Sequence, residues 1–203
     1  MKRFMKYILI IDTVLLFVSL GVLMADKETL HDDLIRMHIV ANSNSAEDQT
    51  IKHIVKKSVV AYLEPKMMDF SDRESAMMYL GNNLDDICCI VNTTLQEQGS
   101  NYTASISLKK EAFPMRDYET FSLPSGVYNT LRITIGGGEG ENWWCVVFPT
   151  LCAGATAESV DAYAVGSGFS PGLSNTLTKK DNYNIRFFLL DCIGKLENLI
   201  FGF

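Results

Sequence analysis

A run of 19 mostly apolar residues, 7–25, restricts the fold and the location of this chain more than any other part of the sequence. Only Asp12, Thr13, Ser19 and Gly21 interrupt it. A helix of about 20 residues spans the hydrocarbon core of a bilayer, so the run is long enough to cross a membrane. Three basic residues precede it, and such flanks stay on the cytoplasmic side. The remainder of the chain is therefore expected outside the membrane.

Residues 1–25 serve either as a retained anchor or as a cleaved signal peptide. Signal peptidase prefers small residues at positions −3 and −1, and cleavage after Ala25 would place Leu23 at −3. The run is also longer than the apolar part of a typical signal peptide. We favour the anchor, with cleavage as the alternative. Residues 26–33 are then a short polar linker to a single domain, 34–203.

The part outside the membrane is acidic. Residues 1–25 hold three of the 18 basic and one of the 24 acidic residues, which leaves a net charge of −8 on residues 26–203. Nucleic-acid binding needs a basic patch that neutralises phosphates, and none is visible in the sequence. Nucleic acid is excluded as a partner.

The first strand of the domain is predicted at residues 34–40. Its residues alternate, with Arg36 and His38 on the face opposite three apolar side chains. Asn42 follows in a polar turn. This strand therefore has one apolar face that can pack on a core and one polar face that points away from that core.

Two long helices follow, at residues 46–63 and 71–98. Pro65 is expected to end the first and Gly99 the second. Lys52 is expected on the solvent side of the first helix. We expect both helices to pack on one face of a sheet.

The second half of the domain is predicted to form strands at 102–108, 118–123, 127–135 and 143–148. The glycine-rich residues 136–140 lie between the last two. Glycine tolerates the positive φ of tight turns, so this segment indicates a β-hairpin.

The remaining residues complete an α/β fold of the α+β kind. Residues 154–181 are small and polar, which indicates a variable loop. Residues 183–188 look extended, and 189–201 predict a closing amphipathic helix. The expected architecture is a mixed, mostly antiparallel sheet with two long helices on one face and a C-terminal helix.

Both tryptophans of the chain are adjacent, at positions 143 and 144. Neighbouring strand residues point to opposite faces, so one can fill the core while the other faces outward. Tryptophan is enriched among the residues that dominate protein interfaces. If the first strand lies beside this segment, a partner-binding surface would comprise Arg36, His38, Asn42, Glu139, Asn142, Trp143 and Trp144. The alternative is that the tryptophans only pack and the glutamates are only solvated.

Five cysteines in an exported domain indicate disulfide bonding. Cys145 and Cys152 flank a short loop and are the expected pair, and the odd count leaves at least one further thiol without an intramolecular partner. Alternatively, Cys145 is a nucleophile with His38 as its base, in an exported hydrolase or transferase. No metal or cofactor is expected, because one positioned histidine is too few ligands and the glycine loop lacks nucleotide-binding spacing.

Three segments, 34–49, 131–152 and 185–188, resemble the stage II sporulation protein R family of endospore-forming bacteria. The resemblance departs at Gly136, Gly137 and Thr150, and little of 154–181 matches. With the N-terminal run it spans nearly the whole chain.

The resemblance implies a signalling protein that is not an enzyme. Such proteins are made in the forespore and exported into the space between the forespore and mother-cell membranes. There they trigger a mother-cell membrane aspartic protease that removes the pro-sequence of sigma factor E. The expected partner is therefore the extracytoplasmic part of that protease, with residues 7–25 contacting the membrane.

Overall fold

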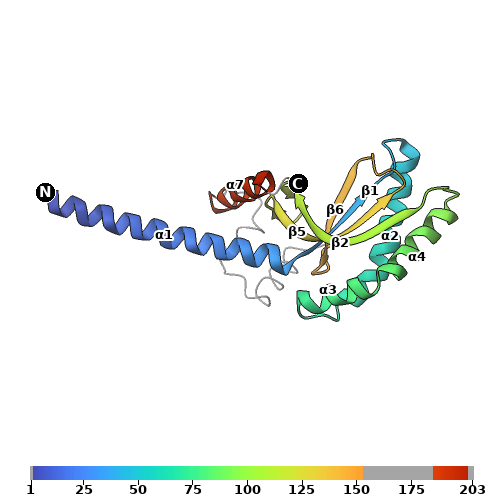
Figure 1. Ribbon diagram of the computed structural model, residues 1–203, viewed down its shortest axis with the longest axis horizontal. Coiled ribbons are helices and arrows are strands. Elements are labelled where there is room, and N and C mark those ends of the chain that lie inside the picture. The colour runs from blue at the N-terminus through green and yellow to red at the C-terminus, as the bar shows by residue number, and fades with distance from the viewer. Residues whose placement is uncertain (1, 153–184, 201–203) are drawn as a thin grey trace.

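The computed structural model describes residues 2–152 and 185–200 (Figure 1). A long N-terminal helix projects from a domain built on a four-stranded sheet. Three helices cover one face of this sheet, and a C-terminal helix lies near the junction with the N-terminal helix (Figure 1). The expected variable loop at 154–181 lies outside the described residues.

The N-terminal helix α1 runs from Lys2 to Asp33. It is long and apolar enough to cross a membrane, because an 18-residue window of it has a mean hydropathy of 2.6. A signal sequence can have the same length and composition. This is compatible with export or anchoring. Residues 26–33, expected as a linker, continue the helix because Leu30 is fully buried against the domain and Lys27 pairs with Glu197 of the C-terminal helix at 2.8 Å.

The main sheet contains β1 (Ile35–Val40), β2 (Ala104–Phe113), β5 (Gly126–Ile135) and β6 (Asn142–Phe148). Their order is β2-β5-β1-β6. β1 is parallel to β5 and antiparallel to β6, and β2 is antiparallel to β5. The prediction of a mixed, mostly antiparallel sheet is confirmed.

The predicted hairpin at residues 136–140 is wrong. β1 lies between β5 and β6, so this segment is a connection that passes the end of β1. Gly136 and Gly138 do adopt positive φ, at 56° and 64°. The glycines therefore reflect a tight loop, but the loop does not pair the strands it joins.

Three helices, α2 (Ala46–Met67), α3 (Arg73–Asn82) and α4 (Leu84–Glu97), pack on one face of the sheet. Pro65 does not end α2, which continues to Met67. The second predicted helix forms two separate helices, α3 and α4, because the backbone of Asn83, at φ −117°, departs from helical geometry. Fully buried core residues beneath them are Met37, Ile39, Val55, Val59, Leu63, Leu80, Ile87, Val91, Leu95, Leu131 and Ile133.

A second, smaller core lies on the other face. It is covered by the short strands β3 (Arg116–Asp117) and β4 (Ser122–Leu123), by the end of α1 and by α7 (Ile185–Ile200). The closing helix is confirmed, although residues 185–188 are helical where an extended segment was expected. The buried residues of this second core are Leu23, Leu30, Leu34, Phe113, Phe121, Leu123, Tyr128, Val146 and Leu190.

Candidate functional site

Polar side chains gather on the sheet face turned away from α2, α3 and α4. The strand register aligns Ser107, Arg132, His38 and Trp144 in one row across all four strands. We call the following set the polar face: Ser107, Lys109, Glu111, Arg116, Arg132, His38, Asn142 and Trp144. All but His38 and Glu111 are at least partly exposed.

Glu111 is the centre of this face. Its carboxylate accepts a hydrogen bond from His38 Nδ1 at 2.8 Å and from Arg132 Nη1 at 3.0 Å, and Lys109 Nζ lies 3.2 Å away. Burial alone would raise the pKa of Glu111. The hydrogen bonds and charges of His38 and Arg132 outweigh it and lower that pKa from 4.5 to about 2.

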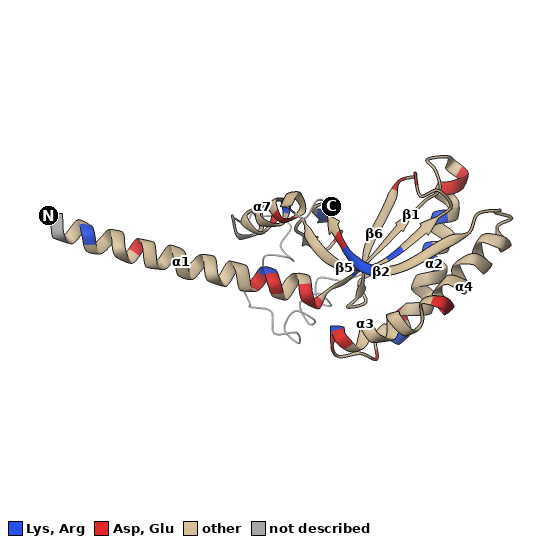
Figure 2. Ribbon diagram, in the orientation of Figure 1, with Lys and Arg blue, Asp and Glu red and all other residues tan. Residues whose placement is uncertain are grey.

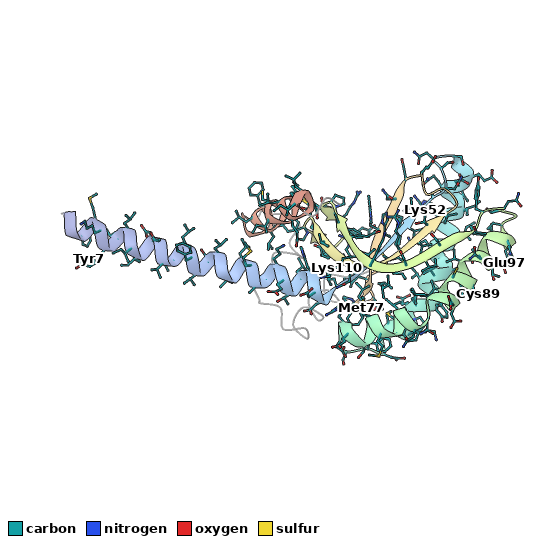
Figure 3. The ribbon with its side chains drawn as sticks, in the orientation of Figure 1. Tyr7, Lys52, Met77, Cys89, Glu97 and Lys110 are labelled. Carbon is teal, nitrogen blue, oxygen red and sulfur yellow. A yellow bond between two sulfur atoms is a disulfide. The ribbon has the colours of Figure 1, made fainter. Side chains whose placement is uncertain are left out.

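This lowered pKa predicts acid sensitivity. A carboxyl group whose pKa is lower in the folded state stabilises the fold above its unfolded pKa, and this contribution is lost as pH falls from about 4.5 to about 2. Glu111→Gln should lower the free energy of unfolding at neutral pH by on the order of 2 kcal/mol, and hardly at all near pH 2. Urea unfolding across this pH range measures both. Glu97→Gln, on the exposed side of α4 (Figure 3), is the control; an equal acid response in Glu111→Gln and the unsubstituted chain would contradict the assignment.

His38 links the carboxylate to the aromatic end of the face. Its Nε2 lies 2.8 Å from Asn142 Oδ1, and its ring stacks on Trp144 with centroids 5.5 Å apart. The guanidinium carbon of Arg116 lies 3.7 Å from the centroid of the same indole ring. Trp144 thus contacts two side chains that restrict its orientation, and a side chain restricted in this way would lose less entropy in an interface.

Arg36 lies on the same side of the sheet as His38 but is buried against Phe113 and Tyr128, so it is not part of the polar face. It is fully buried, its Nη2 donates to the Tyr118 hydroxyl at 2.6 Å, and its guanidinium carbon lies 3.9 Å from the Phe113 centroid. The sequence grouped Arg36 with the partner-binding residues. Its burial excludes direct contact with a partner, so Arg36 belongs to the second core beside the polar face.

Trp143 lies on the opposite face of the sheet from Trp144. It packs against the core under the helices, and Lys56 Nζ lies 4.5 Å from its ring centroid. The prediction that the two indoles point to opposite faces is confirmed. Both are partly buried, and only Trp144 belongs to the polar face.

Asn42 holds the glycine loop. Its Oδ1 accepts from the Gly137 N–H at 2.9 Å, its carbonyl accepts from the Glu139 N–H at 3.1 Å, and its Nδ2 donates to Asp48 at 2.9 Å. Hydrogen bonds from Ser43 and Asn42 lower the pKa of Asp48. Asn42 therefore anchors a loop at whose surface Glu139 is exposed, and does not present its own amide to a partner.

Lys52, expected in solvent, fastens the other end of this loop. It is 4% exposed and donates to the Glu141 carbonyl at 2.9 Å and to Gln49 at 2.6 Å. Figure 3 shows it where α2 faces the sheet. The loop before β6 is thus fixed from both β1 and α2.

A substitution at Gly140 tests how closely the glycine loop packs against the backbone that follows β1. A Cβ at this position would lie inside contact distance of the Ser43 carbonyl oxygen, which is backbone and cannot rotate away. Gly140→Ala is expected to lower the free energy of unfolding by about 2 kcal/mol. Gly137→Ala is the matched control, because its Cβ would meet Asn42 Oδ1 at an ordinary 3.6 Å. Equal urea midpoints for the two variants would mean that the loop backbone shifts to accommodate the added Cβ, which would contradict the prediction.

Cys145 and Cys152 form the expected disulfide, with Cα atoms 5.4 Å apart. Cys145 lies in the core under the helices, whereas His38 lies on the other face. The alternative pairing of Cys145 as nucleophile with His38 as base is therefore wrong. Cys88, Cys89 and Cys192 are free thiols, and residues 2–152 and 185–200 hold no cluster of three metal-ligating side chains.

Sequence reasoning missed Glu111, Arg132 and Arg116. A usable signal was the alternation along 104–113, which places Lys109 and Glu111 on one side of β2. Arg132 is flanked by two buried residues and would likewise have been placed on the polar side. Grouping these three residues with His38 would have required knowing which strands are neighbours in the sheet.

Fold and surface together define a helix-tethered α+β domain with a charged and aromatic sheet face. The family described as stage II sporulation protein R matches residues 31–158, a range that includes the whole polar face. The Stage II sporulation protein R of Bacillus subtilis (strain 168) is 30% identical over 183 residues, which is 81% of this chain and 82% of the relative. The chain belongs to the stage II sporulation protein R family. No solved structure matches it.

Proposed function

We propose that the chain is an exported signal that activates, by contact, the membrane aspartic protease that removes the pro-sequence of sigma factor E. The observation that carries this proposal is membership of the stage II sporulation protein R family, whose model matches residues 31–158. The protein acts as a ligand, and the chemistry belongs to the protease.

The N-terminal helix supports the proposed location. Its apolar part begins after a basic flank and ends at a folded domain, an arrangement that favours a location of the domain outside the cytoplasm. In a sporulating cell this is the space between forespore and mother cell. Whether α1 stays as an anchor or is cleaved, the domain faces the extracytoplasmic part of the protease.

The polar face and the loop tip supply the proposed contact. Trp144 and Asn142 are accessible and held in place by His38, while Glu139 extends from the adjoining rigid loop. A preorganised surface of this kind can bind one state of the protease better than another and so shift its equilibrium.

Reconstitution tests the function. A host that does not sporulate would express the protease and pro-sigma-E, with or without this chain exported to its surface. Immunoblotting should show shortened sigma-E only when the chain is present. Equal processing with and without it, at equal protease levels, would refute the proposal.

Within this assay, Trp144→Ala is expected to reduce processing at least tenfold, because truncating an interface tryptophan removes 2 kcal/mol or more of binding energy in typical cases. Lys57→Ala, exposed on α2 on the far side of the domain, should leave processing unchanged. Exported amounts are compared by immunoblot. Wild-type processing by Trp144→Ala would remove this residue from the contact.

A further inference from the structure

We propose that the polar face binds an acidic, extended segment that also carries an apolar side chain. Assigning this segment to the protease rests on the proposed function; the binding itself does not.

Charge is the first argument. The polar face includes three fixed cations, Lys109, Arg116 and Arg132, and one carboxylate, Glu111, so its fixed charges sum to +2. Residues 26–203 as a whole carry −8. Figure 2 shows basic residues on β2 where it crosses the other strands. Such a local reversal of sign attracts anionic groups and disfavours cationic ones.

The partners of the cations are the second argument. Lys109 and Arg132 share the single carboxylate of Glu111, and their side chains are 52% and 29% exposed. Arg132 uses Nε toward Thr134 and Nη1 toward Glu111. Its Nη2 makes no hydrogen bond within the described part of the chain. An incoming carboxylate would gain charge-assisted hydrogen bonds from the partly exposed Lys109 and Arg132.

The spacing across the strands sets the form of the ligand. Arg132 lies on β5 and Trp144 on β6, with β1 between them. Neighbouring strands are about 4.8 Å apart, so these side chains are separated by roughly 10 Å. An extended chain advances about 3.3 Å per residue. Side chains two or four residues apart in an extended chain face the same side, and four residues span about 13 Å. Because Lys109 lies on β2, one strand beyond β5, a carboxylate over Lys109 and Arg132 and an apolar side chain against Trp144 therefore belong about four residues apart.

A peptide pair tests this directly. The full chain would be placed in nanodiscs of phosphatidylcholine, which has no net charge, and titrated with acetyl-EDGGL-amide or with acetyl-QNGGL-amide while tryptophan fluorescence is followed. The acidic peptide should bind at least tenfold more tightly. Its affinity should fall as sodium chloride rises from about 50 to about 300 mM, because salt screens exposed charges.

Charge reversal locates the site. Lys109→Glu should weaken binding of the acidic peptide at least tenfold, whereas Lys57→Glu, the same charge change on α2, should not. Arg132→Gln provides a second variant that places no new carboxylate beside Glu111, and unfolding curves confirm that each variant is folded. Equal affinity for the two peptides, or equal weakening by Lys109→Glu and Lys57→Glu, would overturn the proposal.

The two proposals can fail separately. If the unsubstituted chain supports sigma-E processing and Lys109→Glu supports it equally, the signalling function stands and the acidic receptor segment is refuted. If the acidic peptide binds as expected but the chain never supports processing, the binding site stands and the signalling function is refuted.

Discussion

Replacing Cys145 and Cys152 together by alanine is expected to lower the free energy of unfolding by about 2.5 kcal/mol or more. The bridge closes a loop with a sequence separation of seven, and the chain entropy that it removes from the unfolded state corresponds to about that amount. Cys145 is 3% exposed in the main core, so the loss of packing adds to the effect. Urea unfolding of the full chain in nonionic detergent measures it.

Both tryptophans report on this region, because Trp143 and Trp144 directly precede Cys145 on β6. Reduction of the unsubstituted chain should reproduce most of the loss seen in the double variant. Replacing the exposed Cys89 and Cys192 by serine should change the unfolding free energy by less than about 0.5 kcal/mol. An unfolding midpoint that is insensitive to reductant would contradict the stabilising role of the bridge.

Local features of this fold could be predicted from the sequence. The alternation at 34–40 gave β1 with Arg36 and His38 on one side, and Gly99 marked the end of α4 with a φ of 70°. The close spacing of Cys145 and Cys152 gave their pairing. Each of these depends on interactions between residues near in sequence, which a single sequence displays directly.

Strand order could not be predicted, because it depends on contacts between distant residues. The glycine loop after β5 has the composition of a hairpin turn, yet β1 pairs with both β5 and β6 and separates them. Lys52 has the sequence context of a solvated lysine, and its burial depends on a carbonyl 89 residues away. The candidate site could not be predicted for the same reason, because Glu111 contacts His38 only when β2, β5 and β1 pair in the observed register.

The break within the second predicted helix is a subtler case. The apolar stripe continues from α3 into α4, so periodicity alone favours one helix. Asn83 interrupts it, with its side chain donating to the Tyr79 carbonyl at 2.7 Å. Asparagine competes in this way for backbone groups, which makes such breaks possible without glycine or proline.

Arg36→Ala is expected to be the most destabilising single change, lowering the free energy of unfolding by about 3 to 4 kcal/mol. The side chain is fully buried between aromatic rings, with its guanidinium carbon 3.9 Å from the Phe113 centroid and 5.0 Å from that of Tyr128. Truncation to alanine leaves a cavity and removes both cation–π contacts. It also removes the hydrogen bond to the Tyr118 hydroxyl.

Arg36→Met separates packing from charge. The guanidinium is buried, and its Nε and Nη1 have no hydrogen-bond partner among the described residues, so its desolvation offsets much of what its contacts contribute. Methionine fills a similar volume without that penalty and should therefore remain within about 1 kcal/mol of the unsubstituted chain. Thermal and urea unfolding of both variants in the same detergent provide the comparison. If methionine destabilises as much as alanine, the charge and the bond to Tyr118 hold this core together, and a packing role for Arg36 is excluded.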